Sequence, residues 1–308
     1  MVKEFKHISV LPKKTIEFLA PKEGGIYVDA TLGKGGHTKL IAEKIGKAGK
    51  IIAIDQDQEA IEEGKKNLAE YKGRIFFVKD NFRNLDKILE NLKIKKVDGV
   101  LFDFGVSTFQ IENPERGFSF AETEENLNSK LDMRMDKFQS FSALDIINKY
   151  KEDELRDIFL RLGEEKFAGK ISKKIGEARK RKQIIKVRDL LEIIKSAVPK
   201  RYIFGSQYAS RIFRALRMEV NNELPAIEEA LPKAFNLLKQ GGRIVAISFH
   251  SLEDRIVKNF FREISSRKND AEPSAKNITK KPITPSREEI LQNKNSSSAK
   301  LRGVEKLV

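Results

Sequence analysis

Residues 26–38 read IYVDATLGKGGHT: a short β-rich run ending in an aspartate, a turn with three glycines, and the start of an amphipathic segment. Similar β-rich runs follow at 50–57 (KIIAIDQD), 74–81 (RIFFVKDN) and 97–106 (VDGVLFDFGV), separated by segments of helical periodicity. Such alternation is typical of a parallel sheet with helices on its faces. The sequence therefore predicts an α/β, Rossmann-like sheet with its ligand site in the turn after the first strand.

The strand–helix alternation stops after the fourth run. Residues 111–140 are irregular, and from 142 to 198 the apolar residues recur with helical spacing. The α/β pattern resumes with a helix ending near Lys239 and a strand at 243–249 (RIVAISF). We therefore expect a helical insertion between the fourth and fifth strands of one sheet, with the domain boundaries 1–110, 111–205 and 206–308.

The end of the chain carries three further local signals. Residues 251–254 (SLED) resemble a capping box that opens a helix over 252–264. Residues 265–285, with three prolines, predict a long loop. The tail AKLRGVEKLV, 299–308, is interpreted as a last, edge strand of the sheet.

The chain of 308 residues is strongly basic, with 60 Lys and Arg against 45 Asp and Glu and a net charge of +15. Residues 166–201 hold 13 basic against 3 acidic residues, and residues 262–308 hold 11 against 6. The remainder carries 36 of each sign. The excess of basic residues lies in two segments, which indicates that these segments bind a polyanionic partner. The predicted sheet is close to neutral.

Composition also excludes several kinds of protein. The absence of cysteine rules out disulfide scaffolds, Cys-ligated zinc, iron–sulfur clusters and thiolate nucleophiles. With three histidines, a His-rich metal site is not expected either, so no metal is predicted. No apolar run approaches the roughly 20 residues that span a bilayer. The N-terminus lacks a signal peptide's apolar core. We expect a soluble, cytoplasmic protein without a membrane partner.

The glycine-rich turn does not match the phosphate-binding motifs. The dinucleotide pattern G-x-G-x-x-G requires glycine where Thr38 stands, and the pattern G-x-x-x-x-G-K-[ST] is absent. Asp29 in the same turn is unfavourable beside a pyrophosphate but suits a ligand with a positive end. S-adenosyl-L-methionine, which has a sulfonium and an amino group, is such a ligand.

Acidic residues end four successive predicted strands: Asp29, Asp55, Asp80 and Asp103. The carboxyl ends of parallel strands meet at one edge of the sheet, where ligands bind. Asp55 is placed to accept both ribose hydroxyls, and Asn81 and Phe82 follow Asp80 where an adenine would lie. This set predicts an S-adenosylmethionine-dependent methyltransferase.

The missing cysteine narrows the methyl acceptor. Methylation of C5 in a pyrimidine generally requires a thiolate to add to the ring, so a nitrogen or oxygen acceptor remains. An exocyclic base amine is a weak nucleophile and needs an acceptor for its N–H in a rigid pocket. In the loop DFGVST, 103–108, the candidates for this hydrogen-bond acceptor are Asp103 and Ser107, although Ser107 also fits a turn.

Three groups besides the cofactor residues are candidates for substrate binding, and one of them, His250, is expected to face the same edge as the cofactor. His250 follows the strand at 243–249, and the motif LDMRMD, 131–136, concentrates charge in Asp132, Arg134 and Asp136. The alternative for each is structural, as a core histidine or as an ion pair on one face of a turn. The basic run within 166–201 predicts RNA contacts through three consecutive residues: Lys180, Arg181 and Lys182.

Nine motifs appear in a characteristic order: HISVLPKKTIEFL, YVDATLGKGGHT, DGVLFDFGVSTFQI, ERGFSF, LDMRMD, GEEKFAGKI, FRALRMEVNNEL, GGRIVAISFHSLEDRIVK and SSSAKLR. From about residue 7 to 302 the chain resembles the ribosomal RNA small subunit methyltransferase H (MraW) family. The resemblance implies N4-methylation of a cytidine in the decoding region of 16S rRNA, with S-adenosyl-L-methionine as donor. It also implies a Rossmann-like methyltransferase sheet with an inserted helical domain, and it is compatible with a homodimer.

The family's cofactor residues map onto matching positions of this chain. The resemblance implies cofactor contacts for Gly35, Gly36, His37, Asp55, Phe82, Asp103 and Gln110. Asp29 is added to this set because of its position in the turn. The substrate is then 16S rRNA or an assembling small ribosomal subunit.

The chain departs from the family pattern at a few positions. Thr108 and Phe109 replace Ser-Pro beside Gln110, Lys130 replaces a proline before LDMRMD, and Arg214 replaces glutamine. These changes affect the expected shape of the substrate pocket rather than the chemistry at the glycine-rich turn.

Two other functions remain open on the sequence. An NAD-dependent oxidoreductase would use the same sheet edge, but Thr38 and Asp29 disfavour it. A non-catalytic RNA-binding or assembly protein would explain the basic segments but not the ordered carboxylates.

Overall fold

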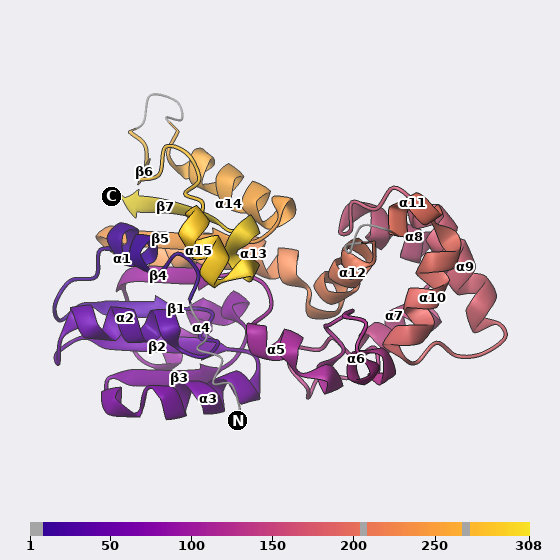
Figure 1. The fold of residues 1–308 in the computed structure, drawn as a ribbon. Coiled ribbons are helices and arrows are strands. Elements are labelled where there is room, and N and C mark those ends of the chain that lie inside the picture. The colour runs from indigo at the N-terminus through magenta and orange to yellow at the C-terminus, as the bar shows by residue number, and fades with distance from the viewer. Residues whose placement is uncertain (1–8, 204–207, 267–271) are drawn as a thin grey trace. The chain divides into compact units, whose positions relative to one another are not determined.

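The computed structural model describes residues 9–203, 208–266 and 272–308. The chain forms two compact units (Figure 1). The sheet unit comprises residues 1–105 and 224–308, and the helical unit comprises Val106–Glu223. Each unit is described by itself below.

The sheet unit is built on seven strands in the order β3-β2-β1-β4-β5-β7-β6. Neighbours from β3 to β5 run parallel, whereas β7 lies antiparallel to β5 and β6 lies antiparallel to β7. Parallel register brings the carboxyl ends of β1 to β5 to one edge. The strands are β1 (Ile26–Asp29), β2 (Lys50–Asp55), β3 (Ile75–Lys79), β4 (Val97–Asp103), β5 (Leu238–Ser248), β6 (Ala275–Asn277) and β7 (Lys300–Lys306).

Helices cover both faces of this sheet (Figure 1). One apolar core cluster contains α4 (Leu85–Asn91), α13 (Glu223–Leu237) and α14 (Ser251–Ile264). The other contains α1 (Pro12–Leu19), α2 (Gly36–Ile45) and α3 (Gln58–Asn67). Successive strand residues alternate between the clusters: in β2, Ile52 and Ile54 belong to the first, Ile51 and Ala53 to the second. Burial on both faces explains why these strands read as unbroken apolar runs.

Short elements complete the sheet unit. They are η1 (Ala69–Tyr71), η2 (Phe82–Asn84), α15 (Arg287–Gln292) and η4 (Lys294–Ser298).

The expected α/β, Rossmann-like class is confirmed, and two details at the end of the chain are corrected. The tail forms β7, but β7 lies between β5 and the three-residue β6, so it is not the edge strand. β6 also interrupts the predicted loop at 265–285, of which residues 267–271 lie outside the described ones. Three residues carry too little periodicity for sequence to identify them as a strand.

The predicted strand 243–249 is present but begins earlier. α13 ends at Leu237, and β5 starts at Leu238, so that the glycine pair 241–242 lies inside the strand. The pairing of β4 with β5 shifts register there, and Gly241 has φ +73°. The glycines therefore form an irregularity in a strand rather than the end of a helix.

The helical unit contains no strand among its described residues, apart from one isolated bridge between Lys130 and Lys186. In it, α8 packs on α9, and α9 packs on α10. Its elements are α5 (Thr108–Glu112), η3 (Pro114–Arg116), α6 (Glu124–Asn128), α7 (Ala143–Lys149), α8 (Glu152–Arg161), α9 (Ala168–Arg179), α10 (Val187–Ala197), α11 (Lys200–Ile203) and α12 (Ser210–Asn221).

The structure draws the boundaries of the insertion at 105/106 and 223/224, where the sequence predicted 110/111 and 205/206. The second boundary differs because α12 packs on α7 and α8 and so belongs to the helical unit. Helical periodicity marks α12 as a helix but does not show which neighbours cover its apolar face. No helix of the described residues is long and apolar enough to cross a membrane.

Candidate active site

Asp29 ends β1 and is almost fully buried, with 1% of its surface exposed. Its Oδ2 accepts a hydrogen bond from the Thr38 hydroxyl at 2.6 Å, and its Oδ1 accepts one from the Thr31 backbone N–H at 3.2 Å. Burial raises the pKa of Asp29. Thr38, which stands where a dinucleotide fold has glycine, thus fastens the glycine-rich turn to the strand that precedes it.

Asp55 ends β2 and holds the turn from the other side. Its Oδ2 accepts from the Gly33 N–H and its Oδ1 from the Asp57 N–H, both at 2.9 Å. Burial raises the pKa of Asp55 to about 6, and the bonds to the backbone offset only part of that effect. The turn needs glycine at Gly33 and Gly35, where φ is +50° and +83°.

His37, the second residue of α2, lies beside Asp103 at the end of β4. Nε2 of His37 is 3.6 Å from Oδ2 of Asp103, longer than a hydrogen bond. Burial lowers the pKa of His37, but the carboxylates of Asp103 and Asp29 raise it more, so that the net shift is upward. The backbone of Asp103 is fixed by its N–H, which donates to the Thr31 hydroxyl at 2.7 Å.

Three buried polar atoms of this pair have no hydrogen-bond partner among the described residues. They are both ring nitrogens of His37 and Oδ1 of Asp103. Buried polar atoms without partners are rare in folded proteins, because each costs the free energy of its lost hydration. Their position at the carboxyl edge of the sheet indicates that a ligand satisfies them.

The loop after β3 brings an aromatic ring to the same edge. The Asn81 amide donates to Oε1 of Gln56 at 2.9 Å and so joins the ends of β2 and β3. The Phe82 ring packs against Phe102 and Phe104, with centroids 5.7 and 5.8 Å apart. Gln56 is not among the predicted site residues, although it directly follows Asp55 at the end of a strand.

These groups fit S-adenosyl-L-methionine. The carboxylate of Asp55 has lone pairs beyond those used by the backbone, which suits a ribose diol. Phe82 offers an aromatic ring in the segment after β3, and Oδ1 of Asp103 offers an acceptor without a partner among the described residues. Both oxygens of Asp29 accept hydrogen bonds from the turn, and its contact with the cofactor stays a prediction.

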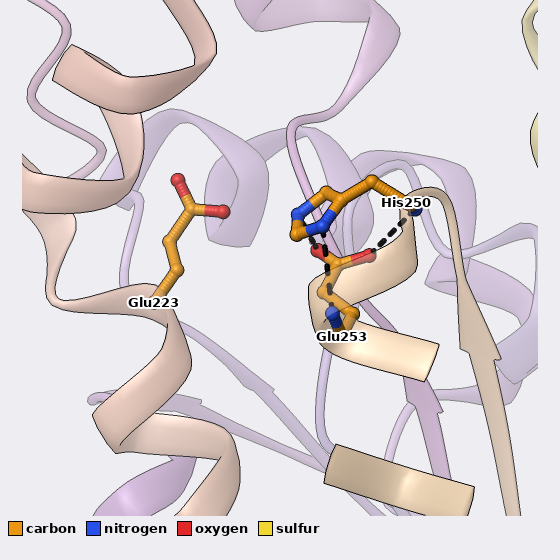
Figure 2. A group of neighbouring side chains, drawn as sticks. All are labelled: Glu223, His250 and Glu253. Carbon is orange, nitrogen blue, oxygen red and sulfur yellow. Dashed lines mark hydrogen bonds and ion pairs between the residues drawn. The ribbon is translucent and has the colours of Figure 1, made fainter. Parts of the chain in front are cut away.

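His250 has a structural role, which the sequence left as the alternative, but as the cap of a helix rather than as a core histidine. It is the N-cap of α14: its Nδ1 accepts from the Glu253 N–H at 3.4 Å, and Oε2 of Glu253 accepts in return from the His250 N–H at 3.4 Å (Figure 2). The capping box therefore begins at His250 and not at Ser251, because Glu253 has to lie three residues after the cap. Glu253 is fully buried, and its Oε2 also accepts from the Phe249 N–H at 2.7 Å.

Ser107 and Gln110 belong to the helical unit and form the capping box of α5. The Ser107 hydroxyl accepts from the Gln110 N–H at 3.3 Å, and the Gln110 side-chain oxygen accepts from the Ser107 N–H at 3.0 Å. The turn role of Ser107, which the sequence left as the alternative to catalysis, is therefore present in the structure.

The charged side chains of LDMRMD bind their own loop. Arg134 donates to both oxygens of Asp132, at 2.8 and 2.7 Å, and to the carbonyl group of Gln139 at 2.6 Å. Oδ1 of Asp136 accepts from the Phe138 N–H at 3.1 Å. Bidentate pairing of this kind fixes the loop conformation as well as contributing energy.

Two buried side chains hold the backbone of the same motif. Arg116 donates to the carbonyl groups of Arg134 and Met135, at 2.9 and 3.0 Å. Asn221 accepts from the Met135 N–H and donates to the Met133 carbonyl, both at 2.8 Å. The motif is thus a structural centre of the helical unit, and its contact with substrate stays a prediction.

The remaining predicted residues also lie in the helical unit. Lys180, Arg181 and Lys182 are exposed where α9 ends. Among the departures from the family pattern, Thr108 and Phe109 open α5, Lys130 forms the bridge to Lys186, and Arg214 donates to the Gly163 carbonyl at 2.7 Å.

Comparison with known proteins supplies a family. The model of the MraW methylase family matches residues 4–307. Ribosomal RNA small subunit methyltransferase H of Caldicellulosiruptor saccharolyticus is 48% identical, over 98% of this chain and 100% of its own. Its counterpart in Sulfurihydrogenibium is 49% identical over 96% and 98%. Among solved structures, a putative rRNA methylase from Clostridium thermocellum aligns with a TM-score of 0.47 and 15% identity, over 98% of both chains.

Proposed function

The chain belongs to the MraW methylase family, and from this we propose that it methylates the exocyclic N4 of a cytidine in the decoding region of 16S rRNA, with S-adenosyl-L-methionine as donor. The observation that carries the proposal is the extent of the family match, which spans nearly the whole chain. Relatives that align over the same length bear the name ribosomal RNA small subunit methyltransferase H. Membership of a methylase family favours methyl transfer over both a hydride-transfer enzyme and a non-catalytic RNA-binding protein.

Each of the proposed cofactor residues contacts or positions a different part of the ligand. S-adenosyl-L-methionine, when bound, supplies an electrophilic methyl group on a positively charged sulfur. Asp55 accepts hydrogen bonds from the ribose hydroxyls, and Phe82 lies against the adenine. Gly35 and Gly36 are expected to contact the ligand through the backbone of the turn, and a Cβ at either position would collide with Leu68 or Ser9. Asp29 is a positioning residue, since it holds the turn through Thr38 and Thr31.

The amine that accepts the methyl group has to be aligned and hydrogen-bonded by the protein. Its lone pair is conjugated into the base, so the protein has to align the nitrogen and accept one of its N–H groups. Oδ1 of Asp103 has no partner among the described residues and is the acceptor that we assign to this task. His37 lies beside it, with Nε2 3.6 Å from Oδ2 of Asp103. The chain has no cysteine, so the covalent route to C5 of a pyrimidine is closed.

The family resemblance suggests further contacts on the substrate side. Gln110 is expected to complete the cofactor site, and the RNA is expected to contact His250, the LDMRMD loop and Lys180–Lys182. The substrate is 16S rRNA or an assembling small subunit, which places the protein in the cytoplasm. Dimer formation, which the resemblance permits, is tested by measuring the molar mass in solution.

Mass spectrometry of rRNA nucleosides tests the proposal. Unmodified 16S rRNA, free or in small subunits, is incubated with the protein and methyl-labelled S-adenosyl-L-methionine, and the digested nucleosides are separated. We expect the label in N4-methylcytidine, mapped to one decoding-region fragment, and its loss in Asp103→Ala. Label in C5-methylcytidine, or none in any 16S rRNA substrate, would refute the proposed reaction.

A further inference from the structure

Two aromatic rings and a lysine come together in the helical unit, at the loop between α8 and α9 and the short helix α11. The rings of Phe167 and Tyr202 meet edge to face, with centroids 4.9 Å apart. The ammonium group of Lys166 lies over both rings, 5.2 Å from the first centroid and 5.0 Å from the second. A cation within about 6 Å of a ring centroid is attracted to the face of the ring. We call Lys166, Phe167 and Tyr202 the aromatic–lysine cluster.

A buried carboxylate fixes the position of this cluster. Glu165 has none of its surface exposed, and its Oε2 accepts from the Tyr202 hydroxyl at 2.7 Å while its Oε1 accepts from the Phe167 N–H at 2.8 Å. Arg211 and Arg214 of α12 donate to the carbonyl groups of the two residues before Glu165, at 3.1 and 2.7 Å. Burying a carboxylate is costly unless it is hydrogen-bonded. The loop therefore holds both rings in a defined arrangement, and Glu165 has no part in the cofactor site.

The cluster is open to solvent. Lys166 is exposed and both rings are partly exposed. No carboxylate in the described ranges forms an ion pair with Lys166. A cation that is already positioned by two rings loses little conformational freedom when it binds a ligand.

The surrounding charge indicates what that ligand is. The members of the cluster lie at the two ends of the segment 166–202, and residues 166–201 contain 13 basic but only 3 acidic residues. Three exposed cations lie close to these members in sequence: Lys170, Lys200 and Arg201. Aromatic rings set among cations are the usual composition of surfaces that bind single-stranded nucleic acid, because rings stack on bases while cations contact phosphates.

We propose that the aromatic–lysine cluster binds single-stranded RNA, with Lys166 on a backbone phosphate and the exposed part of the Phe167 and Tyr202 rings against a base. The inference rests on the proposed function in taking RNA as the substrate, and it assigns an RNA contact to residues far along α9 from Lys180–Lys182. Stacking on a ring is tolerant of sequence, so the cluster contributes affinity and orientation rather than the choice of the methylated base.

Substitutions in the full chain test the contribution of the Tyr202 ring and that of the Lys166 charge separately. Tyr202→Leu removes a ring without changing charge, and Tyr202→Phe keeps the ring while removing the hydroxyl. Lys166→Gln removes the positioned cation, and Lys65→Gln, an exposed lysine of α3, is the matched control. Binding of a fluorescein-labelled single-stranded RNA from the decoding region is followed by anisotropy over a range of salt concentrations. Thermal unfolding and S-adenosyl-L-methionine binding of each variant report on its folding.

We expect Tyr202→Leu to weaken RNA binding about tenfold, within the range for loss of one base–aromatic stack, and Tyr202→Phe to stay within about threefold of wild type. Lys166→Gln should lower the slope of log K against log salt by about 0.7, the value for one phosphate contact on a single strand, and Lys65→Gln should not. Cofactor affinity should be unchanged in all four variants.

Three results would overturn the inference. Tyr202→Leu binding RNA as wild type does would show that the ring makes no contact. Tyr202→Phe binding as weakly as Tyr202→Leu would show that only the bond to Glu165 matters. An equal loss of slope in Lys65→Gln would reduce Lys166 to general surface charge. Failure of the proposed function is distinguishable, because it is the absence of labelled N4-methylcytidine with the wild-type protein, whatever the variants' RNA affinities.

Discussion

The charge on Asp55 is the feature of the cofactor site that can be tested most directly. Its two oxygens accept backbone hydrogen bonds from Gly33 and Asp57, and burial raises its pKa to about 6. Asp55→Asn keeps the shape of the side chain but removes the charge. Hydrogen bonds to a charged group contribute roughly 1.5–3 kcal/mol each. The loss of one such bond to the ribose should weaken S-adenosyl-L-methionine binding at pH 7 by about 10- to 150-fold.

The same pKa predicts a pH dependence. With a pKa of about 6, roughly 90% of Asp55 is ionised at pH 7 and about 10% at pH 5. Protonation of Asp55 should therefore lower the affinity about tenfold between pH 7 and pH 5, and this part of the pH dependence should vanish in Asp55→Asn. His37 also has a raised pKa, caused by Asp103 and Asp29 against the opposing effect of burial. His37→Gln is the control variant, and it should retain the pH dependence of cofactor affinity that is due to Asp55.

Isothermal titration calorimetry at pH 5, 6 and 7 and constant ionic strength measures these affinities. Stability of the ligand-free protein provides a second readout of opposite sign. Because the folded-state pKa is raised above 3.8, the stabilisation from Asp55 is greatest below pH 3.8 and is lost as the pH rises through 6. The total is about 3 kcal/mol for this difference in pKa. Wild-type affinity that does not vary between pH 5 and 7, together with unchanged affinity in Asp55→Asn, would refute the assignment of Asp55 to the ribose.

Three further substitutions test the structure. Asp254→Ala breaks a largely buried ion pair with Arg302, whose Nε lies 2.7 Å from Oδ1 of Asp254. This change should lower the free energy of unfolding, measured by urea denaturation, by roughly 3 kcal/mol. In the wild type, Arg302 and Lys300 outweigh burial and lower the pKa of Asp254, so the stabilisation by this ion pair should be lost only as the pH falls below 4. Gly117→Ala places a Cβ 2.2 Å from the Lys130 carbonyl oxygen at φ +68° and should destabilise the protein by more than about 1–2 kcal/mol; an unchanged melting temperature would contradict that geometry. RNA binding should weaken, with a flatter salt dependence and unchanged cofactor affinity, when glutamine replaces three residues at the end of α9: Lys180, Arg181 and Lys182.

Sequence alone predicted the sheet and the edge at which we propose that the ligand binds. Strands buried on both faces give unbroken apolar runs, and the residue that ends each parallel strand necessarily lies at the same edge. The positions of Asp55 and Asp103 at that edge were therefore predicted without coordinates. The family resemblance, based on motifs in order, then suggested the reaction that we propose.

The partners of those residues were decided by the tertiary structure. Asp29 was predicted to contact the cofactor, and the structure adds that its two oxygens accept hydrogen bonds from Thr38 and Thr31. His250 was considered as a substrate contact or a structural histidine, and its ring caps α14. The residue type at either position does not reveal these hydrogen bonds, and the ligand contacts of both residues stay predictions.

In the helical unit, too, the sequence predicted the helices while the tertiary structure decided the hydrogen-bond partners. Periodicity revealed its helices, but the reason for the charges of LDMRMD lies in Arg116 and Asn221, which approach the motif from before and well after it in the chain. Likewise β6 joins the sheet only because β7 is there to pair with it. Local sequence determines which segments are strands and helices, since their periodicity is a property of neighbouring residues. Hydrogen bonds between distant segments form only when packing brings their donors and acceptors together, and these contacts determined which polar residues support the fold and which remain for a ligand.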